Sequence, residues 1–192
     1  MTARQKVKKL LYPLLMLFAP KTKFGRRLYN NSHQNPKTSF YELTAITAEG
    51  EKFDFQQLKG KKVLIVNTAS DCGFTAQLAE LQKLQTANES HLQIIAFPSN
   101  EFKNQEKLTD SEIVSYCKNN YRITFPIMAK TRVVKGKDQN EVFQWLTFSR
   151  LNGWNDHAPD WNFSKYLVDE NGTLISYGGP AIPASEMLLK IQ

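Results

Sequence analysis

Apolar residues in the middle of this chain follow two spacings, one typical of strands and one of helices. Val63 to Val66 is an unbroken apolar run rich in β-branched residues, and Leu92 to Phe97 is a second run. Runs of this length are typical of strands buried on both faces. Between them, Leu78, Leu81 and Leu84 recur at helical spacing. The pattern predicts a strand, a helix and a second strand in succession.

Turn and capping signals place further elements around this core. Hairpins are expected over residues 40–55, with Glu49-Gly50 at the turn, and over residues 163–177. Thr109 and Glu112 form a capping box, so a helix begins at Thr109. Together these elements predict an α/β fold with a central mixed β-sheet flanked by helices and an N-terminal β-hairpin. The remaining expected elements are a helix over 140–151, a closing helix over 183–191 and a short buried segment at 125–128 that enters another strand.

The N-terminal 37 residues differ from the rest of the chain. An apolar run from Leu10 to Ala19 lies between basic residues and is about ten residues long, whereas a bilayer-spanning helix needs roughly 20. Its helical spacing suits a segment in a membrane interface, although Pro13 weakens that helix. A signal peptide and an inert tail are the alternatives. We expect a basic tail and linker at residues 1–37, with Gly25 to Lys37 as the linker, and one domain at 38–192.

The positive net charge would suggest a nucleic-acid-binding protein, but the position of the basic residues argues against that class. The chain carries +7, and residues 1–30 hold eight Lys or Arg and no acidic residue. The remaining residues therefore carry 17 basic and 18 acidic side chains, a balance of −1. The basicity belongs to the tail, so we expect no nucleic-acid ligand for the domain.

Cys72 is the first candidate for chemistry, because it lies between the predicted strand and helix. The partial positive charge of a helix N-terminus favours thiolate, the nucleophilic form of cysteine. A buried, inert cysteine is the alternative. Thr75 occupies the position where a Cys-x-x-Cys motif would carry its second thiol. Asp71, the preceding residue, would disfavour thiolate if its charge faces the sulfur.

The surrounding motifs carry a resemblance to a known family. Val66 to Thr75 reads Val-Asn-Thr-Ala-Ser-Asp-Cys-Gly-Phe-Thr, and Ala96 to Glu106 contains Phe-Pro-Ser-Asn-Glu-Phe-Lys-Asn-Gln-Glu. Asp160 to Asp169 contains Trp-Asn-Phe-Ser-Lys-Tyr-Leu-Val. With the segment Ile113 to Met128, these stretches resemble the glutathione peroxidase family, in its cysteine-containing, thioredoxin-dependent form. The resemblance implies a thioredoxin-like fold, in agreement with the predicted order of elements.

The resemblance also implies a set of site residues. It places the peroxidatic cysteine at Cys72, the catalytic amide and indole donors at Gln105, Trp161 and Asn162, and the resolving cysteine at Cys117. Amide and indole N–H groups can stabilise a thiolate without adding a group that titrates. A second Trp-Asn pair, at residues 154–155, lacks the strand motif that should follow it. No cofactor and no metal are expected.

The implied activity is a thiol-dependent peroxidase that reduces hydrogen peroxide or organic and lipid hydroperoxides. Its implied reductant is thioredoxin, with glutathione as the alternative. The short segment from Gly136 to Asp160 favours a monomer, because tetrameric members of the family carry an insertion there. We expect a cytoplasmic protein that contacts the membrane surface through residues 4–27. A membrane-tethered redox sensor and a non-catalytic thioredoxin-like binding module remain the alternative functions.

Overall fold

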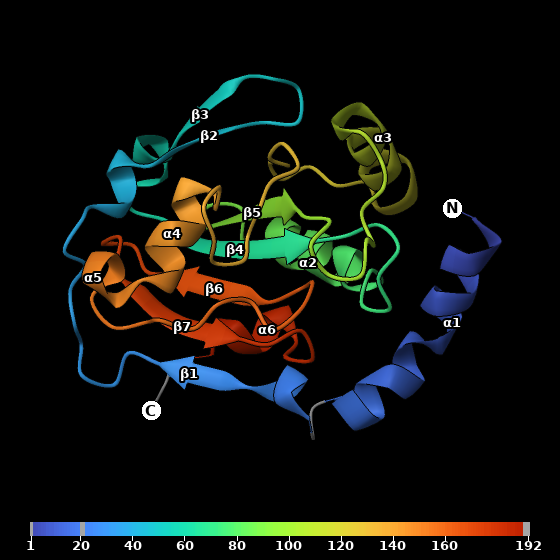
Figure 1. The fold of residues 1–192 in the computed structure, drawn as a ribbon, viewed down its shortest axis with the longest axis horizontal. Helices are drawn as coiled ribbons and strands as arrows, with labels where there is room; N and C mark the ends of the chain where they lie inside the picture. Colours follow the sequence, from blue (N-terminus) through green and yellow to red (C-terminus); the bar gives the residue numbers. More distant parts are fainter. Residues whose placement is uncertain (1, 20–21, 190–192) are drawn as a thin grey trace.

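A five-stranded sheet forms the centre of the protein (Figure 1). The computed structural model describes residues 2–19 and 22–189. The strand order is β1-β7-β6-β4-β5, in which β4 and β5 are parallel and the other neighbours are antiparallel. The expected mixed sheet is therefore confirmed. Its strands are β1 (Arg27–Tyr29), β4 (Lys62–Thr68), β5 (Leu92–Pro98), β6 (Lys165–Val168) and β7 (Leu174–Gly178).

The central strands are buried on both faces, as their unbroken apolar runs predict. In β4, Leu64 and Val66 belong to one apolar cluster, whereas Val63 and Ile65 belong to a second cluster on the opposite face. This alternation follows the two-residue period of a strand. Three helices contribute side chains to the first cluster and α4 (Glu141–Thr147) contributes to the second. Those three are α2 (Gln77–Ala87), α3 (Asp110–Tyr121) and α6 (Ala184–Met187).

Local signals placed most of the remaining elements correctly. The expected hairpins are β2 (Thr44–Ile46) with β3 (Lys52–Asp54), and β6 with β7. Thr109 caps α3 through the capping box with Glu112. The helical spacing of the N-terminal apolar run is realised in α1 (Ala3–Phe18), which contains Pro13, and the structure adds α5 (Ser149–Asn152). It also has short 3₁₀ turns at η2 (Lys23–Gly25), η3 (Phe40–Glu42) and η4 (Phe55–Leu58).

The linker expected over residues 25–37 is wrong in part, because it contains a strand of the sheet. Leu28 of β1 pairs with Tyr177 of β7, and the Asn30 N–H donates to the Ile175 carbonyl at 3.0 Å. The three-residue strand has too little pattern of its own to be recognised, and its pairing with β7 defines it. The N-terminal region is thus joined to the sheet.

Two expected helices are shorter in the structure. The helix over 140–151 is broken at Phe148, whose φ of −126° and ψ of 113° are those of extended backbone. The preceding Thr147 donates its hydroxyl to the Phe143 carbonyl, and neither Thr nor Phe is a strong helix former. The closing helix ends at Met187, and residues 190–191 lie outside the described residues. The segment at 125–128 makes only single bridges, through Ile127 and Met128.

Candidate active site

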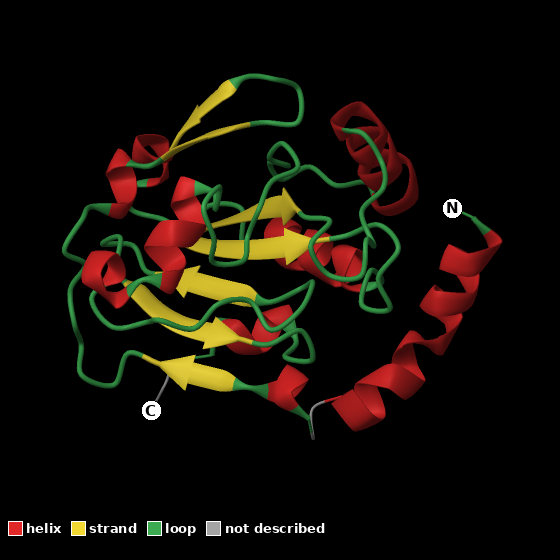
Figure 2. Cartoon of the chain, in the orientation of Figure 1, coloured by secondary structure: helices red, strands yellow, loops and turns green. Residues whose placement is uncertain are grey.

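Cys72 lies in the turn that connects the carboxyl end of β4 to α2. Its N–H donates to the Thr75 hydroxyl oxygen at 3.1 Å, and that hydroxyl lies 2.9 Å from the Ala69 carbonyl oxygen. Thr75 therefore holds the turn in shape from within. Figure 2 shows several loops gathered at this end of the sheet, on the side where α1 lies.

The Cys72 thiol is buried in this conformation. The residue is 1% exposed, and burial raises the pKa of the thiol to about 11. Smaller influences that lower the pKa come from the Phe74 N–H, 3.4 Å from the sulfur, then from Trp161, Lys8 and Asn162. α2 begins only at Gln77, five residues after Cys72. The expectation that a helix N-terminus favours thiolate here is therefore wrong for this conformation, because desolvation outweighs the nearby donors.

The expected amide donors lie together beside the loop that carries Cys72. The Asn162 side-chain amide donates to the Gln105 side-chain oxygen at 3.1 Å. The backbone carbonyl of Gln105 accepts from the Asp71 N–H at 2.9 Å. Gln105 thus lies next to the residue that precedes Cys72, and Trp161 and Asn162 are near enough to lower the pKa of the Cys72 thiol. The structure brings together residues that the sequence separates by more than 30 positions.

Backbone strain is concentrated in the two loops that carry these donors. Lys103 and Asn104, just before Gln105, have φ of 54° and 50°. Phe163, just after Asn162, has φ of 70°. Left-handed backbone is unusual for a buried aromatic residue, and such strain persists only where the surrounding structure enforces it. Here the Phe163 N–H donates to the Asn67 carbonyl of β4 at 2.6 Å, which fixes the bend.

Glu106 holds the loop that carries Cys72 in place, and sequence reasoning missed this role. Its carboxylate accepts from the Ser70 N–H at 2.7 Å and from the Ser70 hydroxyl at 2.8 Å. The Ser70 carbonyl accepts from the Tyr116 hydroxyl of α3 at 3.3 Å. Glu106 is 2% exposed, and burial raises the pKa of its carboxyl. The only sequence signal for this role was the position of Glu106, an acidic residue directly after the expected site residue Gln105.

The N-terminal helix packs against this same loop. The Lys8 ammonium lies 2.6 Å from one carboxylate oxygen of Asp71, and the Arg4 guanidinium lies 3.3 Å from the other. The Gln5 side chain donates to the Ser70 carbonyl at 3.2 Å. The charge of Asp71 is therefore balanced by two cations. The concern that Asp71 would repel a neighbouring thiolate does not hold in this arrangement.

Comparisons with known proteins agree with this geometry. The family model described as glutathione peroxidase matches residues 40–147, more than half of the chain. The "Glutathione peroxidase-like peroxiredoxin 2" of Saccharomyces cerevisiae is 43% identical over 139 residues, 72% of this chain and 85% of that protein. The chain belongs to the glutathione peroxidase family. The expected enzyme class, a peroxidase, is confirmed by this membership.

Solved structures confirm the thioredoxin-like fold of this glutathione peroxidase. The crystal structure of Trgpx in its apo form is 29% identical, with 79% of this chain and 91% of that chain covered and a TM-score of 0.61. A thiol:disulfide interchange protein of the thioredoxin family from Chlorobium tepidum is 18% identical, with 74% and 83% covered and a TM-score of 0.52. The second likeness shows the fold alone.

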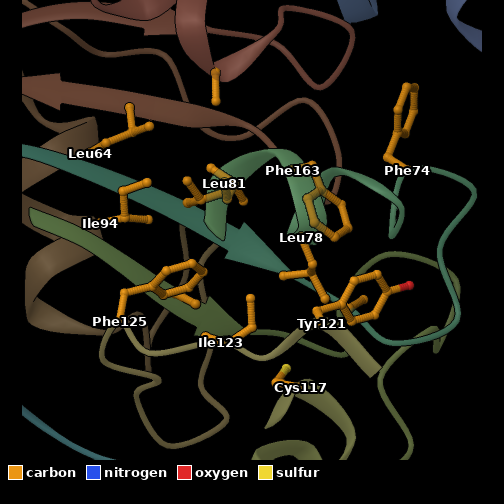
Figure 3. Packing of buried hydrophobic residues seen from close by; sticks show 14 of the residues in the cluster. Leu64, Phe74, Leu78, Leu81, Ile94, Cys117, Tyr121, Ile123, Phe125 and Phe163 are labelled. Atoms are coloured by element: carbon orange, nitrogen blue, oxygen red, sulfur yellow. The ribbon is translucent and has the colours of Figure 1, made fainter. Parts of the chain in front are cut away.

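The second cysteine of this glutathione peroxidase lies inside α3. Cys117 is 7% exposed, and burial, followed by the charge of Glu106, raises the pKa of its thiol to about 12. Figure 3 shows it packed near Tyr121 and Ile123. Both cysteines are free thiols and belong to the same apolar cluster. Cys117 therefore has to leave its packed position before it can react as a thiolate.

The second Trp-Asn pair has a structural role. The Trp154 indole donates to the Leu174 carbonyl at 2.7 Å, and the Asn155 side chain donates to the Leu146 carbonyl at 2.7 Å. Both contacts connect loops to the domain core, away from Cys72. Among residues 2–19 and 22–189, no cluster of His, Cys, Asp or Glu could hold a metal ion. In the same part of the chain, each helix is too short or too polar to cross a bilayer.

Proposed function

We propose that Cys72 is the peroxidatic residue of this thiol peroxidase. The thiolate attacks one peroxide oxygen, the O–O bond breaks, and the leaving oxygen takes a proton to become water or an alcohol. Cys72 is then a sulfenic acid. The observation that carries the proposal is the Phe74 N–H at 3.4 Å from the buried sulfur, together with Trp161 and Asn162, which lower the pKa of the Cys72 thiol. These donors can stabilise the negative charge that burial otherwise disfavours.

Asn162 is suited to contact the substrate as well as the sulfur. Its side-chain oxygen is buried and has no hydrogen-bond partner within the described part of the chain. A buried acceptor without a partner is costly, so a ligand that donates to it gains affinity. The O–H of a hydroperoxide is such a donor. We therefore assign Asn162 to substrate orientation, and Gln105 to fixing the Asn162 amide through their 3.1 Å contact.

Replacement of the indole donor tests this assignment. We expect Trp161→Phe to slow the oxidation of Cys72 by about 100-fold, the loss typical for one preorganised donor. The phenyl ring retains stacking with Phe24 and Phe102, whose rings lie 6.0 and 5.4 Å from Trp161. Stopped-flow peroxide consumption in a single turnover measures this step. Gln105→Leu should slow the same step.

The matched control for this test is Trp154→Phe, the same change at the structural tryptophan. It should leave the oxidation rate within a few-fold of wild type. Reduction of the oxidised enzyme by thioredoxin should proceed normally in the Trp161 and Gln105 variants. Equal slowing of oxidation and reduction would instead indicate general destabilisation and would remove Trp161 from the catalytic set.

We propose that Cys117 resolves the sulfenic acid and that thioredoxin reduces the resulting disulfide. The Cys117 thiolate attacks the Cys72 sulfur, the S–O bond breaks, and the leaving hydroxide takes a proton to become water. The Cys72–Cys117 bond that results is then reduced by the thioredoxin dithiol. The chain has only these two cysteines, so no other internal pairing exists.

Turnover measured side by side with thioredoxin and with glutathione decides the reductant. If the oxidised protein instead passes its disulfide to a partner protein and shows no turnover, it is a redox sensor. A Cys72 that does not react with peroxide would identify a non-catalytic binding module.

The same proposal includes peripheral contact with a membrane surface through residues 4–27. Six large apolar side chains on α1 are more than half exposed, and the N-terminal 30 residues carry eight basic and no acidic side chains. Apolar area and positive charge together attract a helix to anionic lipid. The domain is proposed to act as a monomer.

Vesicle co-sedimentation tests the membrane contact. We expect the Leu10→Ser/Leu14→Ser/Leu17→Ser variant to bind anionic vesicles at least about 100-fold more weakly than wild type, because each leucine loses most of its transfer free energy. Ile46→Ser, which removes a 51% exposed apolar side chain on β2, is the control and should bind normally. Binding that survives the triple substitution would eliminate α1 as the contact.

A further inference from the structure

The N-terminal segment covers the site that the proposed function assigns to Cys72. Figure 1 shows α1 lying along the end of the sheet where β4 and β5 finish. Leu15 of α1 packs so closely on the peroxidatic loop that a Cβ at Gly73 would lie 3.3 Å from its Cδ2. Tyr12 and Met16 pack against the same apolar cluster that contains Cys72. The inner face of α1 therefore forms a wall of the site.

Phe24, in the η2 turn after α1, extends this cover over the catalytic indole. Its ring centroid is 6.0 Å from that of Trp161 and 6.0 Å from that of Phe74. The Phe24 carbonyl accepts from the Ala181 N–H at 2.9 Å, which anchors the turn to the domain. α1 and Phe24 together, called the cap below, cover both sides of the turn that holds Cys72.

Ion pairs hold the cap at Asp71, in addition to the Gln5 contact with the Ser70 carbonyl. Asp71 pairs with Lys8 at 2.6 Å and with Arg4 at 3.3 Å, and Lys8 also donates to the Asp71 carbonyl. Under this cap Cys72 is only 1% exposed. Part of this cover must move before a hydroperoxide reaches a sulfur buried to this degree, and the Leu15 contact at Gly73 makes α1 part of the cover.

The outer face of α1 has the opposite character. Val7, Leu10, Leu11, Leu14, Leu17 and Phe18 are between 53% and 80% exposed. Contiguous apolar patches of this kind on a soluble domain mark interaction sites. Lys6 and Lys9 are exposed beside this face. Positive charge around an apolar strip complements an anionic lipid surface better than a neutral or basic protein surface.

A lipid surface would also favour the open position of the cap. Residues 10–18 are apolar on every side of the helix, so Tyr12, Leu15 and Met16 can enter lipid only after they leave the domain. Lipid phosphates can replace Asp71 as partners of Arg4 and Lys8. A ligand shifts a conformational equilibrium by its differential affinity for the two states. The apolar side chains and the two cations on the inner face of α1 provide this difference in affinity, because the closed cap presents only its outer face to lipid.

We propose that α1 and Phe24 form a cap that closes the peroxidatic site in solution and that an anionic lipid surface opens. The closed state is held by the Asp71 contacts to Arg4 and Lys8. The proposal rests on the assignment of Cys72 as the peroxidatic residue. It makes membrane contact a condition for access to the thiol.

The Asp71 contacts to Arg4 and Lys8, called the latch below, are tested by alkylation of Cys72 with iodoacetamide. Mass spectrometry of the Cys72 peptide measures the reaction. We expect Arg4→Gln/Lys8→Gln to react at least about 10-fold faster than wild type, since local opening governs access to buried groups. The matched control is Lys6→Gln, compared with the single variant Lys8→Gln, since each removes one charge from the same helix. Lys6 makes no side-chain ion pair within the described residues. Lys9 is left in place because it lies over the Tyr121 ring at 5.1 Å and so contacts the domain. The control should react like wild type.

The pH profile separates a latch from a purely electrostatic role of Lys8. Among charged groups near Cys72, Lys8 lowers the pKa of its thiol. Asp71, the preceding residue, pairs with Lys8 and Arg4, and Glu106 accepts hydrogen bonds from Ser70 of the same loop. If the cap opens, the thiol regains water and its half-maximal reactivity moves to lower pH, because burial is the main cause of the raised pKa. If Lys8 only stabilises thiolate in an accessible site, its loss moves the profile to higher pH and slows alkylation. That second result, or unchanged rates, would overturn the proposal.

The lipid arm uses wild-type protein with phosphatidylglycerol-containing vesicles and with pure phosphatidylcholine vesicles. Anionic vesicles should accelerate Cys72 alkylation about 10-fold, whereas neutral vesicles and the Leu10→Ser/Leu14→Ser/Leu17→Ser variant should show no acceleration. Vesicles that bind the protein but leave alkylation unchanged or slower would overturn lipid opening. Concentration-dependent dimerisation through the outer face of α1, without lipid binding, would show that this face binds a second copy of the chain. That result would also overturn lipid opening. Alkylation does not require peroxidase activity, so the cap and the proposed function can fail independently.

Discussion

Cys72→Ser should abolish hydroperoxide reduction, with a loss of at least about 10³-fold, because a serine hydroxyl cannot take the place of the thiolate nucleophile. The folded state should be unaffected, since the hydroxyl is close in size to the thiol and the turn is held by Thr75 rather than by the sulfur. Peroxide consumption with thioredoxin as reductant measures the activity, and thermal unfolding checks the fold.

The control for this experiment is Cys117→Ser, which also removes one buried thiol from the same apolar cluster. It should oxidise Cys72 at the wild-type rate in a single turnover. If the Cys72 variant retains turnover, or if both variants lose the first oxidation step equally, Cys72 is not the peroxidatic residue.

Loss of the second thiol should block recycling rather than oxidation. After one equivalent of peroxide, wild type should contain a Cys72–Cys117 disulfide, whereas Cys117→Ser should hold a sulfenic acid and then accumulate sulfinic acid. Multiple turnover with thioredoxin should fall by at least about 100-fold in the variant, because no disulfide forms for thioredoxin to reduce. Non-reducing peptide mass spectrometry distinguishes these species. Sustained turnover of Cys117→Ser with thioredoxin would show that Cys117 is only a packed helix residue.

We expect part of α3 to unwind when this disulfide forms. A disulfide needs Cα atoms within about 7 Å, and Cys117 lies one turn from the end of a helix that is capped at Thr109 and packed through Ile113 and Tyr121. The closed loop of about 45 residues would constrain the unfolded chain by roughly 4 kcal/mol in the entropic account, less any native strain. Hydrogen exchange over residues 110–121 should therefore rise in the oxidised enzyme. Unchanged protection together with a formed disulfide would mean that the peroxidatic loop moves instead.

The elements that could be predicted from the sequence are those with strong local signals. The β4 and β5 runs, the α3 capping box and the Asn-Gly turn between β6 and β7 need no distant partner to be recognised. β1 depends on pairing with β7, about 150 positions away, so its three residues carry no pattern of their own. The motif resemblance placed Gln105 and Asn162 in one site, and the structure brings them within 3.1 Å.

The state of the thiol could not be predicted in the same way. Position in the chain suggested a helix N-terminus beside Cys72, but burial by surrounding side chains dominates the pKa. The Lys8–Asp71 contact joins residues 63 positions apart, and no periodicity links them. Glu106 likewise acts through Ser70, 36 positions away. Long-range contacts of this kind decide electrostatics and access, whereas local patterns decide secondary structure.

The pairing of β1 with β7 means that the inhibitory segment stays attached to the domain at all times. Arg27 begins β1 only eight residues after Ala19, the C-cap of α1. A tether this short holds its end near the site at an effective concentration in the millimolar range. Closure is then an intramolecular event, so the closed fraction does not change when the protein is diluted. Expression level alone would not relieve the inhibition, and only a competing surface for α1 would.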